Sequence, residues 1–306
     1  MNTNKNLTIQ ETFNLAVKNH QESKTDIAQD LYNQVLKIDP NHTHANNNLG
    51  LIFQKLGENQ KAIGCFEKAI SINPNYVNAL NNLGIIFKEL GENQKAIGCF
   101  EKAISINPNY VNALNNLGII FKELGENQKA IGCYEKAISI NPNYVNAFNN
   151  LGNIFQELGE NEKAKECYEK TIAINPNHFN AHFHLGNIFK ELGENEKAKE
   201  CYEKAISINP NHFNALNNLG NIFKELKDYQ KALDCYEKAI EINPNYQVAL
   251  INRGKILFDK GEFELSLIDF DNCNTFDSRA CALTSLYAIG HIDEIYKRIK
   301  KNSQLD

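Results

Sequence analysis

The chain of 306 residues has no tryptophan and one methionine, and no apolar run approaches the roughly 18 to 20 residues that span a bilayer. It also has no basic excess, because 32 lysines and arginines stand against 37 aspartates and glutamates. Neutralising nucleic-acid phosphates needs a strongly basic surface, so DNA and RNA are not expected partners. The opening residues, MNTNKNLTIQ, lack the apolar centre of a signal peptide. We therefore expect a cytoplasmic protein that does not engage membranes.

Motifs that carry catalysis or hold cofactors are missing as well. The sequence has no Cys-x-x-Cys pair for zinc and no glycine-rich loop for phosphate, since helical glycines such as Gly98 stand alone. Charged pairs such as Lys88-Glu89 recur along the chain, whereas a catalytic site is ordinarily needed once. His178 and His182 are four residues apart, but no third metal ligand is evident. We expect no enzyme activity, no cofactor and no metal site.

What the sequence has instead is a repeat. Its seven prolines are spaced by 34 residues, at Pro40, Pro74, Pro108, Pro142, Pro176, Pro210 and Pro244. Leu-Gly pairs and single alanines keep the same period, and the stretch NNLGIIFKELGENQKAIGC occurs unchanged at 81–99 and 115–133. A period of this size indicates stacked supersecondary units.

One unit, 77–110, shows how each repeat is expected to fold. Its apolar residues recur at helical spacing until Gly91, and a second stripe begins at Ala96 and ends before Pro108. The pattern predicts helix, turn, helix, turn. Neither helix buries its apolar stripe alone, so neighbouring units must stack.

Two residues of this unit predict close packing between its helices. Gly84 falls where the helices approach, and the large side chain of Phe100 is expected to fill the space beside it. The pattern resembles the tetratricopeptide repeat, whose consensus is matched by Leu83, Gly84, Phe87, Gly91, Ala96, Phe100, Ala103 and Pro108. One departure is the absence of the family's early tryptophan. The resemblance implies an all-α, right-handed superhelical solenoid of stacked helix-turn-helix units with a C-terminal capping helix pair.

The period also predicts the domain organisation. We expect an N-terminal tail at 1–8, a solenoid at 9–280, and degenerate capping helices with a C-terminal tail at 281–306. The expected units are 9–42, 43–76, 77–110, 111–144, 145–178, 179–212, 213–246 and 247–280.

The last predicted helix is amphipathic. Its apolar stripe consists of Ile292, Ile295, Tyr296 and Ile299, and charged residues occupy the other side. We expect it to act as a lid over the open end of the stack. Its basic residues, Lys297, Arg298, Lys300 and Lys301, also complement the helix dipole and need not form a binding patch.

Six of the eight cysteines follow the repeat, from Cys65 to Cys235. Equivalent residues of stacked helices lie roughly 8 to 10 Å apart, whereas a disulfide needs Cα atoms within about 7 Å. We expect free, partly buried thiols and a reducing compartment.

The first helices of most units carry asparagine at the second position, the sixth position or both, although asparagine is a mediocre helix former. These positions share a side of the helix about 120° from the apolar stripe. By the resemblance, first helices line a concave groove, and in O-linked N-acetylglucosamine transferases the sixth-position asparagines form a ladder that holds extended peptides. A carboxamide both donates and accepts, so a ladder of them pairs with peptide backbone whatever the side chains.

The peptide-binding residues expected from this ladder are Asn48, Asn78, Asn82, Asn112, Asn116, Asn146, Asn150, Asn180, Asn214, Asn218 and Asn252. Unit 179–212 replaces the asparagine pair by Phe183 and His184, which we expect to add selectivity for apolar side chains. The rival explanation of the ladder is an asparagine-rich composition.

The function expected from these residues is that of a monomeric, non-catalytic scaffold that binds an extended segment of a protein partner. One alternative is the substrate-targeting arm of a larger enzyme, a transferase or oxygenase whose catalytic domain is absent from this chain. Another is a self-assembling rod, which needs exposed apolar end faces. A carboxylate clamp for chaperone C-termini is disfavoured, because it needs lysine or arginine where this chain has amides. The sequence does not identify the partner.

Overall fold

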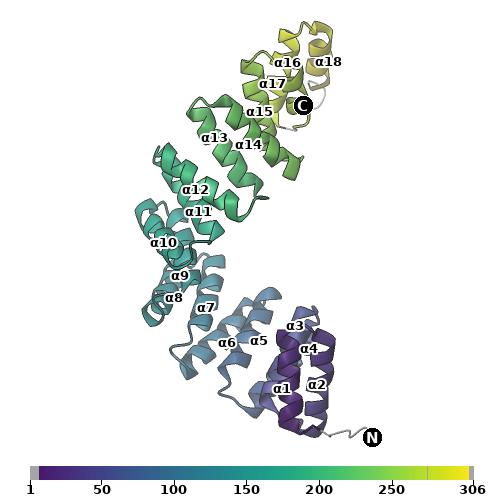
Figure 1. Cartoon of the computed structure of the whole chain (residues 1–306), viewed down its shortest axis with the longest axis vertical. Coiled ribbons are helices and arrows are strands. Elements are labelled where there is room, and N and C mark those ends of the chain that lie inside the picture. The colour runs from purple at the N-terminus through teal and green to yellow at the C-terminus, as the bar shows by residue number, and fades with distance from the viewer. Residues whose placement is uncertain (1–6, 274, 303–306) are drawn as a thin grey trace, which may run out of the picture. The chain divides into compact units, whose positions relative to one another are not determined.

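A computed structural model describes residues 7–273 and 275–302, and all regular secondary structure in these residues is α-helical (Figure 1). Most of the expected N-terminal tail and the last four residues of the C-terminal tail lie outside the described residues. The chain divides into two compact units between Ile154 and Phe155, called here the N-terminal unit and the C-terminal unit.

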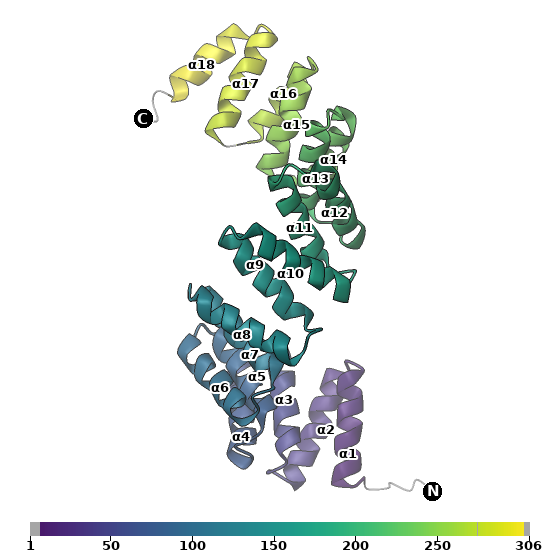
Figure 2. The same ribbon diagram turned by 90° about the vertical axis from the view of Figure 1, so that its left-hand side faces the viewer.

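Helices follow one another in pairs along the chain, and Figure 2 shows the same succession from the side. The first helices of the pairs are α1 (Ile9–Gln21), α3 (Thr43–Lys55), α5 (Val77–Glu89), α7 (Val111–Glu123), α9 (Val145–Glu157), α11 (Phe179–Glu191), α13 (Phe213–Glu225), α15 (Gln247–Asp259) and α17 (Phe276–Ala288). The second helices are α2 (Thr25–Ile38), α4 (Asn59–Ile72), α6 (Asn93–Ile106), α8 (Asn127–Ile140), α10 (Asn161–Ile174), α12 (Asn195–Ile208), α14 (Tyr229–Ile242), α16 (Phe263–Asp271) and α18 (Ile292–Asn302).

Consecutive helices pack against each other, as the predicted solenoid requires. In the N-terminal unit, α4 packs both on α3 of its own pair and on α5 of the next pair. The first helices α3, α5 and α7 also contact one another, and they do so more than consecutive second helices do. Within this unit the first helices therefore lie on the inner side of the stack.

Backbone geometry explains where the helices of each pair end. After α5, Gly91 adopts a φ of 75°, and the N–H of Glu92 donates to the carbonyl of Phe87 at 2.8 Å, which closes the helix end. After α6, Asn107 is extended, and its side-chain oxygen accepts from the N–H of Asn109 at 3.1 Å. Such asparagine turns recur after the second helices of the other units, so the loop asparagines are structural.

The close approach predicted at Gly84 is confirmed. A Cβ atom on Gly84 would lie 2.7 Å from Cε1 of Phe100, a distance that side chains do not tolerate. The ring of Phe100 is fully buried, as is Ala96. The same contact recurs in other units, for example between Gly220 and Tyr236. Glycine is needed in the first helix because a large aromatic ring of the second helix occupies the space of its side chain.

All eight cysteines are free, as predicted. Burial raises the pKa of Cys65 and Cys99 to about 11, so these thiols stay protonated near neutral pH. His178 and His182 have structural contacts: Nδ1 of His178 accepts from the N–H of Ala181, and Nε2 of His182 lies 2.9 Å from the carbonyl of Pro176. In the described part of the chain, no helix is long and apolar enough to cross a membrane.

The last helix departs from the expected lid. Within the apolar stripe, the side chains of Ile292, Tyr296 and Ile299 are exposed, and Ile295 is half-buried. The side of α18 that faces the chain carries Arg298, which pairs with Asp271 at the end of α16, and α18 packs against α17.

Candidate functional site: the asparagine face of the first helices

In the N-terminal unit, the doubled asparagines join neighbouring repeats. The Nδ2 atom of each sixth-position asparagine donates to Oδ1 of the fifth-position asparagine in the preceding repeat. The three bonds run from Asn82 to Asn47 at 3.0 Å, from Asn116 to Asn81 at 3.0 Å, and from Asn150 to Asn115 at 3.2 Å. The fifth-position amides are buried, and Asn81 is 6% exposed. The asparagines of these helices therefore form hydrogen bonds between neighbouring repeats, which explains their presence in spite of a low helix propensity.

The fifth-position asparagines are absent from the residues singled out in the sequence. Only the second and sixth positions share the side of the helix expected to face a ligand, and the fifth position lies nearer the apolar stripe. The signal was nevertheless present, since the fifth and sixth positions are occupied together in Asn81-Asn82 and Asn115-Asn116. A pair that recurs together indicates two coupled roles.

The sixth-position amides keep part of their hydrogen-bonding capacity. Asn82, Asn116 and Asn150 are half-buried, and each uses one of its two N–H donors in the bond between repeats. Among the described residues, no group donates to their Oδ1 atoms. These oxygens are acceptors available on the inner side of the stack.

The second-position asparagines present the opposite group. Oδ1 of Asn78 accepts from the hydroxyl of Tyr110 at 2.9 Å, and Oδ1 of Asn112 accepts from the hydroxyl of Tyr144 at 3.1 Å. Each Nδ2 has two N–H groups, of which one is directed to a tyrosine hydroxyl, Tyr76 for Asn78 and Tyr110 for Asn112, and both side chains are exposed. Asn146 and Asn180 are exposed and Asn214 is half-buried at the same position of their repeats. The face thus combines acceptors at the sixth position with donors at the second.

The C-terminal unit builds its polar contacts around tyrosine. Oδ1 of Asn187 accepts from the hydroxyl of Tyr202 at 2.8 Å and from Nδ2 of Asn218 at 3.0 Å. Oδ1 of Asn221 likewise accepts from Tyr236 and from Asn252, at 2.8 and 3.1 Å. Asn252 also donates to Asn217 at 3.1 Å. Here one amide collects a bond within its own repeat and another from the next repeat.

The fifth-position asparagine is replaced at three places and not one, by Phe13, Phe183 and Ile251. Phe183 occupies the fifth position of its repeat, so Asn218 donates to Asn187 instead. Phe13 occupies the same position in the first repeat, and Asn48 donates to the hydroxyl of Tyr32 at 3.1 Å. The sequence reasoning found only the break at Phe183, because the repeats that contain Phe13 and Ile251 match the pattern weakly.

Aromatic side chains gather around Phe183. Its ring centroid lies 5.0 Å from that of His212, 5.3 Å from that of His184 and 6.1 Å from that of Phe179. His184 itself stacks on Tyr168 with centroids 5.5 Å apart. Phe183 and His184 are half-buried, so the cluster is reachable from outside. The predicted aromatic step is thus a packed cluster contributed by two repeats.

Histidines cap two helices of the C-terminal unit. Nδ1 of His212 accepts from the N–H of Ala215 at 3.1 Å, as Nδ1 of His178 does from Ala181 at 3.2 Å. Burial lowers the pKa of both histidines below its ordinary value. Only the neutral ring accepts through Nδ1, so capping and the lowered pKa agree.

Apart from Oε2 of Glu58, which forms an ion pair with Lys61, two buried side-chain polar atoms of the N-terminal unit have no hydrogen-bond partner among the described residues: the hydroxyl of Tyr134 and Oδ1 of Asn149. The ninth position of the repeat that contains Tyr134 is Ile119. Later repeats have asparagine at this position, for example Asn187 and Asn221. Asn149 has no sixth-position asparagine after it, because the next repeat has His184 there. At each of these two places, one residue of a hydrogen-bonding pair is present and its partner is replaced by another residue type.

Comparison with known families agrees with the fold and the repeat. Models described as tetratricopeptide repeat match residues 42–109, 99–132, 145–178, 167–200 and 213–246, and a model described as TPR repeat matches 118–159 and 186–227. Together these matches run without a gap from 42 to 246. The chain belongs to the tetratricopeptide repeat family, whose repeats imply a protein–protein interaction scaffold.

Solved structures support the same fold. The Pseudomonas aeruginosa protein pilF is similar with a TM-score of 0.63 and 20% identity, over 71% of this chain and 97% of that chain. YrrB, described as a TPR protein with an unusual peptide-binding site, has a TM-score of 0.51 and 23% identity, over 60% of this chain and 95% of that chain. At these identities the likeness shows the fold alone. A search of curated proteins finds no match.

Proposed function

We propose that the chain is a non-catalytic scaffold that binds an extended peptide along the asparagine face of its first helices. The observation that carries this proposal is the array formed by Asn82, Asn116 and Asn150. Each presents a half-buried Oδ1 that no described residue engages, and each stands one repeat after the last.

The spacing of the array suits an extended backbone. Repeats lie about 10 Å apart, and an extended chain rises about 3.3 Å per residue, so one amide meets every third peptide residue. Oδ1 of a sixth-position asparagine accepts a peptide N–H, and Nδ2 of a second-position asparagine such as Asn78 donates to a peptide carbonyl. Neither contact depends on the peptide's side chains.

The bonds between repeats hold the array ready for a ligand. Because Nδ2 of Asn116 is bound to Asn81, the orientation of the Asn116 amide is set before a peptide arrives. Ordering a flexible side chain on binding costs about 0.5 to 1.5 kcal/mol, and this cost is reduced when the rotamer is already fixed.

The aromatic cluster at Phe183 and His184 supplies selectivity in this proposal. An aromatic surface favours an apolar peptide side chain that the amides ignore, and aromatic residues are enriched among binding hot spots. Replacing Phe183 and His184 by asparagine restores the pattern of the other repeats and is expected to broaden the range of peptides bound.

Backbone N-methylation tests the proposal directly. A peptide of about fifteen residues is selected on the protein from a random display library, and its affinity is measured by calorimetry. Removing the N–H at every third residue is expected to weaken binding by about 0.5 to 1.5 kcal/mol per site, and methylating the intervening residues should matter less. Affinity that follows the peptide's side chains and is indifferent to its N–H groups would contradict the proposal.

A further inference from the structure

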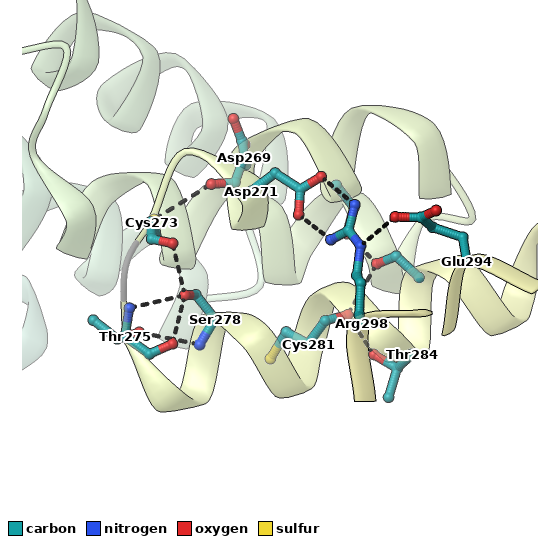
Figure 3. A network of polar contacts seen from close by, with 11 residues as sticks. Asp269, Asp271, Cys273, Thr275, Ser278, Cys281, Thr284, Glu294 and Arg298 are labelled. Carbon is teal, nitrogen blue, oxygen red and sulfur yellow. Dashed lines mark hydrogen bonds and ion pairs between the residues drawn. The ribbon is translucent and has the colours of Figure 1, made fainter. Parts of the chain in front are cut away.

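One arginine of the last helix binds the preceding repeat, and the helix also packs against α17. Figure 3 shows Arg298 of α18 reaching Asp271 at the end of α16 and Glu294 one turn earlier on its own helix. Nη1 and Nη2 of Arg298 donate to the two carboxylate oxygens of Asp271 at 2.5 and 3.0 Å, and Nε donates to Glu294 at 3.1 Å. A bidentate pair of this kind fixes direction as well as distance. The Arg298 side of α18 therefore faces its own chain.

The apolar stripe lies on a different side of the same helix. Ile292, Tyr296 and Ile299 are 42%, 68% and 51% exposed. At about 100° per residue, these three positions fall within an arc of about 60°, well away from Arg298. Their spacing of four and three residues is the one by which a helix presents a seam to another helix.

Charges beside the stripe indicate which helix would fit it. Asp293 and Lys300 flank the stripe on one side, at equal distances along the helix from its middle near Tyr296. An antiparallel partner with the same sequence brings the acidic first turn of one helix opposite the basic later turns of the other. A parallel partner sets acid beside acid and base beside base. The charge pattern of α18 is self-complementary only in the antiparallel arrangement.

We infer that α18 is a homodimerisation helix, which pairs antiparallel with α18 of a second copy of this chain about a two-fold axis. Ile292, Tyr296 and Ile299 form the apolar seam, and Asp293 of each copy pairs with Lys300 of the other. This contact lies outside the asparagine face, so it is independent of the proposed peptide binding. It departs from the monomer expected from the sequence.

The dimer is expected to be weak. Specific interfaces bury about 1,200 to 2,000 Å², and a contact centred on one eleven-residue helix falls at or below the lower end of that range. Association should therefore depend on concentration in the micromolar range and above.

Sedimentation equilibrium of the full chain, over about 1 µM to 1 mM, measures this association. The mean mass is expected to rise towards twice that of one chain. Tyr296→Ser combined with Ile299→Ser should abolish the rise, while Ile38→Ser, which removes an equally exposed apolar side chain from α2, should leave it unchanged. A mass that stays monomeric throughout, a dimer that survives the double serine variant, or a mass that grows past the dimer would each overturn the inference.

Charge reversal tests the antiparallel arrangement. Asp293→Lys is expected to weaken the dimer roughly fivefold, and adding Lys300→Asp in the same chain should restore it. Lys300 also interacts within its own chain, so the informative comparison is between Asp293→Lys and the double variant. Helical circular dichroism of each variant shows whether the fold is kept. Failure of the second change to restore the dimer would contradict the antiparallel pairing.

Discussion

The two units of this chain solve the same packing problem in different ways. In the N-terminal unit, the large buried ring of the second helix is Phe66 or Phe100, and the facing position of the first helix is apolar. In the C-terminal unit, Tyr202 and Tyr236 supply this ring in two repeats and their hydroxyls donate to asparagines, while the hydroxyl of Tyr168 donates to Gln156. Hydroxyl and amide appear together because either one alone would be buried without a partner, at about 1 to 3 kcal/mol.

Tyr32, Tyr134 and Phe270 depart from this division, and Tyr134 is the most informative of the three. It has the tyrosine of the C-terminal unit and, in Ile119, the apolar residue of the N-terminal unit. No hydrogen bond of normal geometry reaches its hydroxyl among the described residues, and burial raises its pKa, a rise that the nearby side chain of Asn150 opposes. Two features that repeat with the same period therefore need not be coupled at every copy.

The largest expected effect comes from removing an amide that serves two donors. Asn187→Leu leaves the hydroxyl of Tyr202 and one N–H of Asn218 without an acceptor, and we expect a loss of about 2 to 4 kcal/mol in the free energy of unfolding. The matched change in the N-terminal unit, Ile85→Leu, should cost less than about 1.5 kcal/mol. The free energies of unfolding of the two variants are compared by urea unfolding followed by circular dichroism. The data are fitted with one stability term for each repeat and one for each interface between neighbouring repeats. Equal losses would show that Asn187 is not the shared acceptor.

Deleting single hydroxyl groups sharpens the same contrast. Tyr202→Phe removes one hydrogen bond and should cost about 1 kcal/mol. Tyr134→Phe removes a buried hydroxyl that has no described partner, so it should be neutral or stabilise the chain by up to about 1 kcal/mol. The two variants are compared by their urea midpoints. A loss at Tyr134 as large as the loss at Tyr202 would mean that its hydroxyl is bonded.

The pH dependence of stability should differ between helices whose N-cap residue is a hydrogen-bonding histidine and helices whose N-cap residue is a tyrosine without a capping bond. The pKa of His178 and of His212 is lowered from 6.5 in the folded chain, so the unfolded chain binds more protons. Stability from these caps is present above pH 6.5 and is lost as the pH falls below it. Each cap contributes roughly 1 kcal/mol. Replacing both histidines by asparagine, which caps without titrating, should reduce the fall in melting temperature between neutral and mildly acidic pH. An unchanged fall would assign it to other groups.

The smallest effect concerns one turn of the C-terminal unit. Lys227 has a φ of 61° where the equivalent turns have glycine, such as Gly91 with a φ of 75°. Lys227→Gly should therefore stabilise the chain by about 0.5 to 1 kcal/mol, and Gly91→Lys should destabilise it by a similar amount. Thermal unfolding of both variants checks the signs. Destabilisation by Lys227→Gly would indicate that the lysine side chain contributes more than its backbone strain.

Much of the fold could be predicted from the sequence because the repeat samples each contact several times. The period, together with Gly91 and Pro108, placed the helix ends, and the pairing of Gly84 with Phe100 followed from their sizes. The asparagine face could be predicted only in part. A helical wheel shows which residues share a side, but the bond from Asn82 to Asn47 depends on the register between repeats, which no single helix contains.

The exposed stripe of α18 was not predictable for a related reason. The apolar residues Ile292, Tyr296 and Ile299 have the spacing of a helix that packs on its own chain. The opposite side of the helix carries Arg298, whose partner Asp271 lies 27 residues earlier in the chain. An ion pair between two charged residues among many leaves no periodic signal in a sequence.

The central claim is that the two asparagines of each pair have different roles. The fifth-position asparagine only joins neighbouring repeats, whereas the sixth-position asparagine joins repeats and also forms a hydrogen bond with the bound peptide. Two triple variants separate these roles, one with Asn47, Asn81 and Asn115 changed to alanine and one with Asn82, Asn116 and Asn150 changed to alanine. Urea midpoint and affinity for the library-selected peptide are measured on both. We expect both variants to remain helical and to lose stability, and only the second to lose affinity, by about 0.5 to 1.5 kcal/mol per lost hydrogen bond. Full affinity in the second variant, or an equal loss of affinity in both, would contradict the account.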